Sequence, residues 1–439
     1  MTSEWISKKF GELLNGKVRN GIYKSKEFHG KGIKIVNMGE LFSNPRLSTS
    51  IEMKLLDVDK DEIDRFGIKK GDLIFARRSL TAEGAGKCIW VKEAEDEAVF
   101  ESSLIRARAN DNISDSQYLY YYFNSPAGKT NLGSILRQVA VSGITGSDLM
   151  ELDIPLPPLE IQRQIANILS AFDDKIELNR QINRTLEQMA RALFKSWFID
   201  FDPVHAKQRG EQPAGMDAET AALIPDRFVE IDGKWFPEGW RVSQLGSIVE
   251  NPRRSINPQS IDGRTPYIGL EHMPRGSIGL NSWGKAKDVD SGKVIFKKGE
   301  ILFGKLRPYF KKVGIAPFNG ISSTDILILK PKINWEEYVL FLVSSDEFIN
   351  AMAGSSSGTR MPRASWNDLA AYPIILPSAA LAVAYSAAVA PIIEKIQLCT
   401  FESIELAHIR DTLLPRLLSG ELDVSDWENA VEAPEGAPA

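Results

Sequence analysis

The sequence predicts an α+β fold with pseudo-twofold symmetry, in which two repeated mixed domains are separated by two long, antiparallel, coiled-coil-like helices. Two observations lead to this prediction. Short motifs return in the same order with a period of roughly 220 to 235 residues, which indicates a duplicated unit. The stretch 159–198 contains no Gly and no Pro, and its apolar residues are spaced by three and four. At 439 residues, the chain is also too long for one compact core.

The repeat has four anchors in each copy. They pair Trp5 and FGELL (10–14) with Trp240 and LGSIV (245–249), KKGDLIFARR (69–78) with KKGEILFGKLR (297–307), ESSLIRAR (101–108) with ISSTDILIL (321–329), and SDLMELDIPLPPLE (147–160) with NDLAAYPIILPSAA (367–380). The period is too long for a solenoid of small repeats, and a long helical pattern follows each copy. The sequence therefore indicates a duplicated unit of one domain and one helix.

The two domains are expected at 1–153 and 240–378. Each contains short runs of β-forming residues punctuated by Gly, Asn and Pro, such as DLIFA in the first and EILFG in the second. Each also carries a short helical pattern near its end. We expect a linker at 205–239 and a flexible tail at 425–439.

The first helix is predicted from Leu159 to Trp197, within a spacer segment at 154–204, and would be about 58 Å long at ~1.5 Å per residue. Its apolar stripe consists of Ile161, Ile165, Ile168, Phe172, Ile176, Ile182, Leu186, Met189, Leu193 and Trp197. Asn179 alone interrupts this seam, and a polar residue there fixes register and partner at some cost in stability. Because a small domain needs no helix of this length, we expect a ruler that holds two domains apart.

The second helix is predicted within 379–424, where it would pack antiparallel to the first. Its stripe consists of Leu381, Tyr385, Ala388, Ile392, Ile396, Cys399, Leu406, Ile409 and Leu413. Pro391 interrupts this stripe, so the helix is expected either to bend there or to begin in earnest only near Ile392.

The chain is expected to be cytoplasmic. Cys88 and Cys399 lie far apart in the sequence, and the N-terminus carries charges where a signal peptide needs an apolar run. The uncharged run 369–393 is long enough to span a bilayer, but it is rich in Ala and broken by prolines. A buried strand end followed by a packed helix is the better prediction for this run.

The net charge of −5 is unevenly distributed. Basic residues exceed acidic ones by 2 in residues 1–150 and by 6 in 241–378, whereas acidic residues predominate by 6 in 151–240 and by 7 in 379–439. Basic blocks are candidate phosphate-facing surfaces, and acidic ones are expected to face protein or solvent. Ordinary charge fluctuation is the alternative interpretation.

Catalytic motifs are weak in this sequence. GSSSG (354–358) has the spacing of a nucleophile elbow, and Asp368 and His408 follow Ser356 in the order of an α/β-hydrolase. A helical pattern precedes the motif, however, where that elbow requires a strand. The four His residues show no metal-ligand spacing with one another or with Cys. We expect a non-catalytic chain without a metal, with the hydrolase as a remote alternative.

Two segments resemble a known family. The run IPLPPLEIQRQIANILSAFDDKIELNRQINRTLEQMARALFKSWFIDFDPV (154–204) closely resembles the central conserved region of specificity subunits of type I restriction-modification systems. The run IRDTLLPRLLSGELDV (409–424) resembles the C-terminal signature of the same family. With the duplicated domains, the resemblance covers nearly the whole chain. The second copy departs from the family pattern at 378–386, where SAALAVAYS replaces a charged LEEQ-like start.

The resemblance implies two target-recognition domains, each reading one half of a split sequence in double-stranded DNA. It implies that the helices dock two modification (methyltransferase) subunits, that restriction/translocase subunits join the assembly, and that no membrane takes part. The chain itself would bind no cofactor, because S-adenosylmethionine, ATP and Mg²⁺ would be used by the partner subunits. A catalytically silent protein-interaction scaffold of the same build is the alternative, consistent with the negative net charge.

Candidate DNA contacts lie in loops that follow the predicted strands. Arg and Lys hold phosphates, Arg can fork onto guanine, and Asn or Gln can fork onto adenine. The candidates are Arg77, Arg78, Arg137 and Gln138 in the first domain, and Lys305, Arg307, Lys311, Lys312, Arg360 and Arg363 in the second. For each of these residues, a solvated surface side chain is the alternative.

Overall fold

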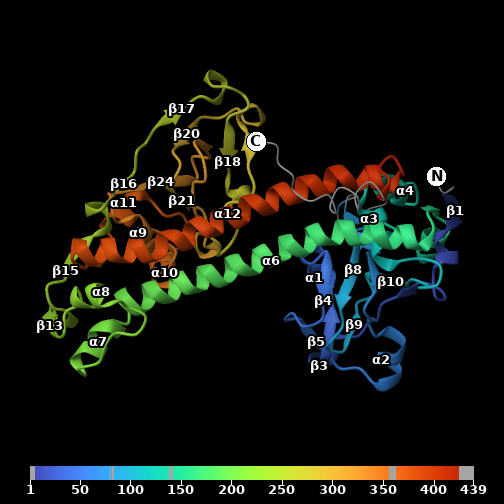
Figure 1. Cartoon of the computed structure of the whole chain (residues 1–439), viewed down its shortest axis with the longest axis horizontal. Coiled ribbons are helices and arrows are strands. Elements are labelled where there is room, and N and C mark those ends of the chain that lie inside the picture. Colours follow the sequence, from blue (N-terminus) through green and yellow to red (C-terminus); the bar gives the residue numbers. More distant parts are fainter. Residues whose placement is uncertain (1–4, 80, 82–83, 138–141, 355–361, 425–439) are drawn as a thin grey trace, which may run out of the picture. The chain divides into compact units, whose positions relative to one another are not determined.

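The computed structural model describes residues 5–79, 81, 84–137, 142–354 and 362–424. The chain divides into two compact units: unit 1 comprises Met1–Asp174 and Leu406–Ala439, and unit 2 comprises Lys175–Glu405. Two helices, α6 (Leu159–Phe198) and α12 (Ala379–Leu418), each contribute a segment to both units (Figure 1). The compact units therefore differ from the predicted domain division, because each unit takes up part of both helices.

Unit 1 contains a five-stranded sheet in the order β2-β10-β6-β8-β4 and a three-stranded sheet in the order β5-β3-β9, counted over its described residues. Besides parts of α6 and α12, its elements are β1 (Ile6–Lys9), η1 (Phe10–Leu13), β2 (Arg19–Asn20), η2 (Lys26–Phe28), β3 (His29–Val36), α1 (Met38–Ser43), β4 (Arg46–Ser48), β5 (Lys54–Leu56), α2 (Lys60–Phe66), β6 (Asp72–Ala76), β7 (Arg78–Ser79), β8 (Cys88–Glu93), β9 (Ala98–Phe100), β10 (Leu104–Arg108), α3 (Ser116–Asn124), α4 (Pro126–Ser134), β11 (Ser142–Gly143), α5 (Gly146–Met150) and β12 (Asp153–Leu156).

The buried strand β6 separates two cores of unit 1. Successive side chains of a strand point to opposite faces. Leu73 and Phe75 accordingly join the core that contains α3, whereas Ile74 and Ala76 join a second core with Phe100. Because both faces are covered, the strand is apolar at four of its five positions and does not alternate with polar residues.

Unit 2 contains a four-stranded sheet in the order β16-β24-β21-β22 and a five-stranded sheet in the order β17-β20-β23-β18-β19, again over its described residues. Besides parts of α6 and α12, its elements are α7 (Asp202–Gln208), α8 (Ala218–Ala222), β13 (Phe228–Ile231), β14 (Lys234–Pro237), β15 (Arg241–Gln244), η4 (Leu245–Ser247), β16 (Val249–Glu250), β17 (Ser255–Ile256), η5 (Pro258–Ser260), β18 (Pro266–Ile268), η6 (Leu270–His272), β19 (Gly284–Lys285), η7 (Ala286–Asp288), β20 (Lys293–Phe296), β21 (Ile301–Gly304), η8 (Pro308–Phe310), β22 (Val313–Ile315), β23 (Gly320–Ser322), β24 (Ile326–Pro331), α9 (Glu336–Val343), α10 (Asp346–Gly354), α11 (Trp366–Ala371) and β25 (Pro373–Leu376). The segment predicted as a linker, 205–239, is folded, and Ile224 is buried in the core of this unit.

The repeat is visible in the way each unit closes. β1 pairs with β12 in unit 1, β15 pairs with β25 in unit 2, and both pairs are antiparallel. The Tyr118 hydroxyl donates to the Pro155 carbonyl at 2.8 Å, and the Tyr338 hydroxyl donates to the Ile375 carbonyl at 2.8 Å. In each unit a helix is thereby tied to the strand that leads into a long helix.

A buried carboxylate marks the same turn in both units. Asp72 and Glu300 follow a Gly with φ of +85°, and each carboxylate accepts a hydrogen bond from the amide three residues upstream. Arg108 forms a bidentate pair with Asp72, with both distances below 3 Å, and Arg254 does the same with Glu300. These pairs compensate the burial of the acids at the start of β6 and β21.

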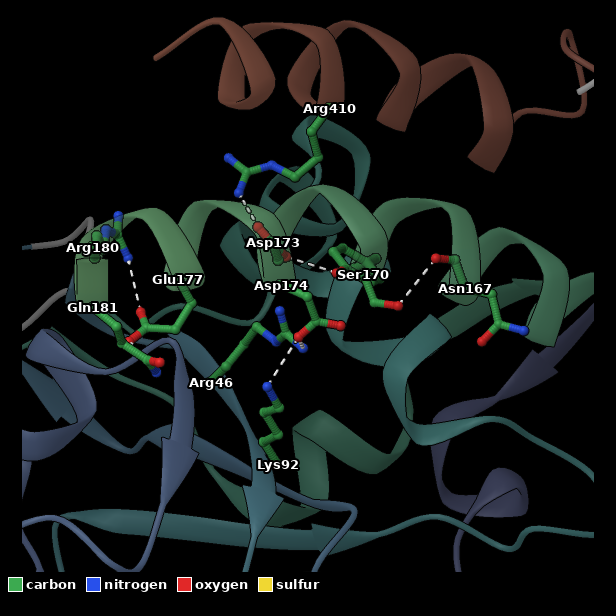
Figure 2. A network of polar contacts seen from close by, with 11 residues as sticks. Arg46, Lys92, Asn167, Ser170, Asp173, Asp174, Glu177, Arg180, Gln181 and Arg410 are labelled. Atoms are coloured by element: carbon green, nitrogen blue, oxygen red, sulfur yellow. Dashed lines mark hydrogen bonds and ion pairs between the residues drawn. The ribbon is translucent and has the colours of Figure 1, made fainter. Parts of the chain in front are cut away.

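In unit 1, the first part of α6 packs against the last part of α12. Ile165 and Leu169 share a core with Leu414 and Leu417. Asp173 is buried beside them, where it accepts a hydrogen bond from Tyr121 Oη at 2.7 Å and pairs with Arg410 of α12 (Figure 2). The helix pair in this unit therefore combines apolar packing with a buried ion pair.

The next residue, Asp174, points toward the sheet of unit 1 (Figure 2). Its Oδ1 lies 2.8 Å from Arg46 Nη2 and 2.9 Å from Lys92 Nζ. Burial opposes the charge on Asp174, but the hydrogen bonds and charges of Lys92 and Arg46 outweigh it and lower its pKa. Consecutive carboxylates thus tie α6 to α12 on one side and to β4 and β8 on the other.

In unit 2, polar contacts show that the remaining parts of the two helices are antiparallel. Asn179 Nδ2 donates to Glu402 Oε2 at 2.8 Å, and Asn183 Nδ2 donates to Thr400 Oγ1 at 3.1 Å. The residue numbers rise along α6 and fall along α12. Together with the repeated sheets, this confirms the predicted α+β fold with two long antiparallel helices.

The buried face of the helices differs in part from the predicted seam. Ile165, Ile176, Asn179 and Ile396 are buried, whereas Phe172, Leu186, Leu193, Ile392 and Leu406 are only partly buried. Met189 is 51% exposed, so its assignment to the seam was wrong. Asn179 is also not the only polar residue on the buried face, because Asp173 and Glu187 are buried as well. Each of these acids has hydrogen-bond partners, which make its burial possible.

Pro391 does not delay the start of α12. The helix begins at Ala379 and continues through Pro391, so the alternative start near Ile392 was wrong. Proline removes the amide that would bond to the carbonyl four residues upstream, and that residue, Ala387, is exposed to solvent. By length and composition α12 could cross a membrane, but Leu381, Tyr385 and other residues of its first part lie in the core of unit 2.

Candidate nucleic-acid interface

The same backbone pairing presents a cation at the end of a central strand in each unit. Arg77 follows β6, and Lys305 follows β21. The Arg77 carbonyl accepts from Ile144 N at 3.0 Å, and the Lys305 carbonyl accepts from Ala364 N at 3.0 Å. The repeat therefore brings a late loop of each domain against the residue that ends the strand, and positively charged side chains gather there.

In unit 1 this edge places Arg78 close to Arg137. Gly143 of β11 pairs with Arg78 on one side and forms a bridge to Arg137 on the other. Arg137 is paired with Asp148 at 2.7 Å, and the half-buried Arg77 donates to the Ser102 carbonyl at 3.4 Å. Arg78 is exposed, and its side chain has no hydrogen bond or ion pair with the described residues. Of these three arginines, it is the one free to meet a ligand.

An aromatic side chain that the sequence reasoning missed lies beside this edge. Phe42 is 42% exposed, and Lys87 Nζ lies 4.7 Å from the centroid of its ring. A Cβ atom placed on Gly84 would lie within 3.0 Å of both Ser79 and Phe42, so the ring is next to the loop after Arg78. Burial, and after it the charge of Lys129, lowers the pKa of Lys87. Phe42 is distant in sequence, so no local pattern pointed to it.

In unit 2 the loop after Lys305 has an unusual backbone. Arg307 and Lys311 flank η8 with φ of +50° and +51°, a left-handed conformation that costs free energy for residues other than Gly. Between them, Tyr309 is 47% exposed. The Arg275 guanidinium lies 3.8 Å from the centroid of the Phe310 ring, and that of Arg307 lies 5.9 Å away. Arg275 was also missed, since no motif surrounds it.

The other candidates fall into three groups. Lys311 pairs with Asp346, and Lys312 donates to the Leu270 carbonyl, so both ammonium groups are already engaged. Lys305 and Arg363 are brought together, because Leu306 forms a bridge with Arg363. Gln138 and Arg360 lie outside the described residues.

The structure gives Asp368, one residue of the hydrolase alternative, a helix-capping role. Asp368 accepts hydrogen bonds from the amide and hydroxyl of Ser365, which makes it part of the N-terminal cap of α11. His408 is exposed on α12, and Ser356 lies outside the described residues. Among the residues that the structure describes, no group of three or more His, Cys, Asp or Glu could hold a metal ion.

Known proteins with similar sequences share one description. Residues 2–188 match the family model "Type I restriction modification DNA specificity domain". The chain is 27% identical to the type I restriction enzyme HindI specificity subunit of Haemophilus influenzae, over 94% of this chain and 99% of the relative. It is 29% identical to the MjaIX specificity subunit of Methanocaldococcus jannaschii, over 71% of this chain and 70% of the relative. The fold is similar to that of the type I S subunit from M. genitalium, with a TM-score of 0.55, 15% identity and coverage of 94% and 96%.

Proposed function

The chain belongs to the family of specificity subunits of type I restriction-modification systems, and from this membership we propose that it selects the DNA sequence on which such a system acts. It is a non-catalytic subunit. Its two domains would each read one half of a split target, and the long helices would set the gap between the halves. Phosphate contacts would position each domain, and contacts to base edges would specify the sequence.

One observation supports the reading of two half-sites more than any other. Each unit places a cation at the end of its central strand, opposite the same late loop of the domain. Around these points lie aromatic and basic side chains: the exposed Phe42 and Arg78 in unit 1, and the exposed Tyr309 and partly buried Arg307 in unit 2. Duplicated surfaces with different side chains suit a protein that reads two different short sequences.

We further propose that two modification subunits dock on the helices. Leu178 and Met189 of α6 and Leu398 of α12 are each at least 49% exposed, although they are large and apolar. Exposed apolar side chains on long helices are typical of protein interfaces. Restriction/translocase subunits would join this assembly, and S-adenosylmethionine, ATP and Mg²⁺ would be bound by the partner subunits. The assembly would act in the cytoplasm, where its DNA lies.

Methylation mapping tests the proposal directly. DNA would be sequenced from cells that express this chain with its modification subunit and from cells that express the modification subunit alone. We expect a split methylated motif only when both proteins are present. If the assembled complex methylates no defined motif, the chain is a scaffold of the same build, and the DNA-reading proposal fails.

A further inference from the structure

A cavity in unit 2 gathers three cationic side chains. It has a volume of about 380 Å³ and is lined by Arg253, Lys305 and Arg363, by hydroxyl and amide side chains, and by apolar residues that include Leu327 and Trp366. The three cations come from different parts of the domain: Arg253 precedes β17, Lys305 follows β21, and Arg363 lies shortly before α11. Arg253 was not among the residues singled out in the sequence.

The charges in this cavity are poorly compensated. Arg363 pairs with Asp325, the one carboxylate that acts on Lys305 within the described part of the chain. Burial lowers the pKa of Lys305, and the positive charges of Arg363 and Arg253 lower it further. Neither the Lys305 ammonium nor the Arg253 guanidinium has a hydrogen-bond acceptor among the described residues. Folding therefore holds like charges together at a cost that a bound anion would offset.

Among its described residues, unit 1 carries no cation at the positions equivalent to Arg253 and Arg363. In unit 2, Arg253 lies seven residues after Gly246. Gly246 matches Gly11 of unit 1, and the residue seven positions after Gly11 is Val18. In unit 2, Arg363 precedes the residue whose amide donates to the Lys305 carbonyl. In unit 1, Gly143 precedes the residue whose amide donates to the Arg77 carbonyl, so Gly143 is the equivalent of Arg363. A cavity elsewhere in unit 1 is lined by three carboxylates, Asp148, Glu151 and Asp153, with Arg137. The cationic cavity is therefore a property of unit 2 and not of the repeat.

We propose that this cavity binds one backbone phosphate of the DNA that unit 2 contacts, with Lys305 as the central ligand and Arg253 beside it. The proposal rests on the function proposed above. A phosphodiester offers only acceptor oxygens and a negative charge, which matches three converging donors. A base edge would require a more balanced set of donors and acceptors. The contact would therefore position the domain on DNA without reading a base.

The test uses the full chain in complex with its modification subunits and a duplex that carries the mapped target. Single methylphosphonate substitutions, which remove one phosphate charge each, would be scanned along the duplex with wild-type protein, Lys305→Gln and Arg253→Gln. Lys298→Gln is the matched control, because this exposed lysine precedes the same strand β21 that Lys305 follows. Affinity would also be measured over a range of salt concentrations, on the target and on a scrambled duplex.

We expect Lys305→Gln to weaken binding to both duplexes by about tenfold at low salt. The slope of log affinity against log salt should fall by about 0.9, the value for one lost phosphate contact. At one position of the duplex, a methylphosphonate should weaken binding by wild-type protein but not by Lys305→Gln. The same methylphosphonate should still weaken binding by Lys298→Gln. Thermal stability should not fall, because Lys305→Gln removes a repelled charge. If Lys305→Gln proves unstable, the exposed Arg253 provides the same test.

Two results would overturn the proposal. Selective loss of binding to one target base, with an unchanged salt slope, would show that Lys305 reads a base edge. Stabilisation of wild-type protein by inorganic phosphate, without any position-specific effect of methylphosphonates, would assign the cavity to a free anion. Failure of the proposed function is distinguishable from both, because wild-type protein would then show no preference for any mapped sequence.

Discussion

Replacement of Asp173 by Asn should destabilise unit 1 far more than the same change at Asp174. The Asp173 side chain is 9% exposed, and it holds both Arg410 and the Tyr121 hydroxyl. Breaking a buried ion pair costs ~3–5 kcal/mol. Since Asn still accepts a hydrogen bond and Arg410 keeps Asp411, we expect about 2–3 kcal/mol. For a unit of this size the expected fall in Tm is roughly 4–12 °C.

Asp174→Asn is the matched control for this prediction. Its side chain is 51% exposed and pairs with Lys92 and Arg46, so its loss should cost at most about 1 kcal/mol. Thermal unfolding of the full chain would measure both variants. Hydrogen exchange of the part of α12 in unit 1 would show whether this helix is released first. Equal effects of the two substitutions, or an effect of Asp173→Asn below about 1 kcal/mol, would refute the reasoning from burial.

Three further outcomes are expected. Tyr118→Phe and Tyr338→Phe should each cost about 1 kcal/mol, and hydrogen exchange should locate each loss in the mutated unit; an effect on the other unit would contradict the repeat. Burial raises the pKa of Glu187 in the folded protein above its ordinary value of 4.5. The contribution of Glu187 to the free energy of unfolding is therefore complete below pH 4.5 and is lost as the pH rises through the pKa of the folded state. Glu187→Gln should therefore raise Tm at neutral pH and leave it unchanged near pH 4, and a lower Tm at neutral pH would argue against this. Four residues inserted into α6 would lengthen it by about 6 Å, which should widen the gap of the methylated motif by one or two base pairs and leave both half-sites unchanged; an unchanged gap would argue against the ruler.

The sequence determined the features that depend on local patterns. The apolar spacing after Leu159 predicted a helix that ends at Trp197, and α6 ends one residue later, at Phe198. The β-forming runs DLIFA and EILFG, which follow the returning KKG motif, predicted a strand in each domain, and β6 and β21 lie there. These predictions succeed because helix and strand periodicity are properties of neighbouring residues.

Only the tertiary structure decided which polar side chains are buried and which cations converge. Asp173 and Glu187 face inward because Arg410 and Ser277, far away in the chain, supply the hydrogen bonds that make burial possible. Met189, apolar and in step with the predicted stripe, is exposed. Arg253 and Lys305 are distant in the chain and line the same cavity only in the folded domain. Compensation of buried charge depends on atoms brought together in space, and the order of residues along the chain does not contain that information.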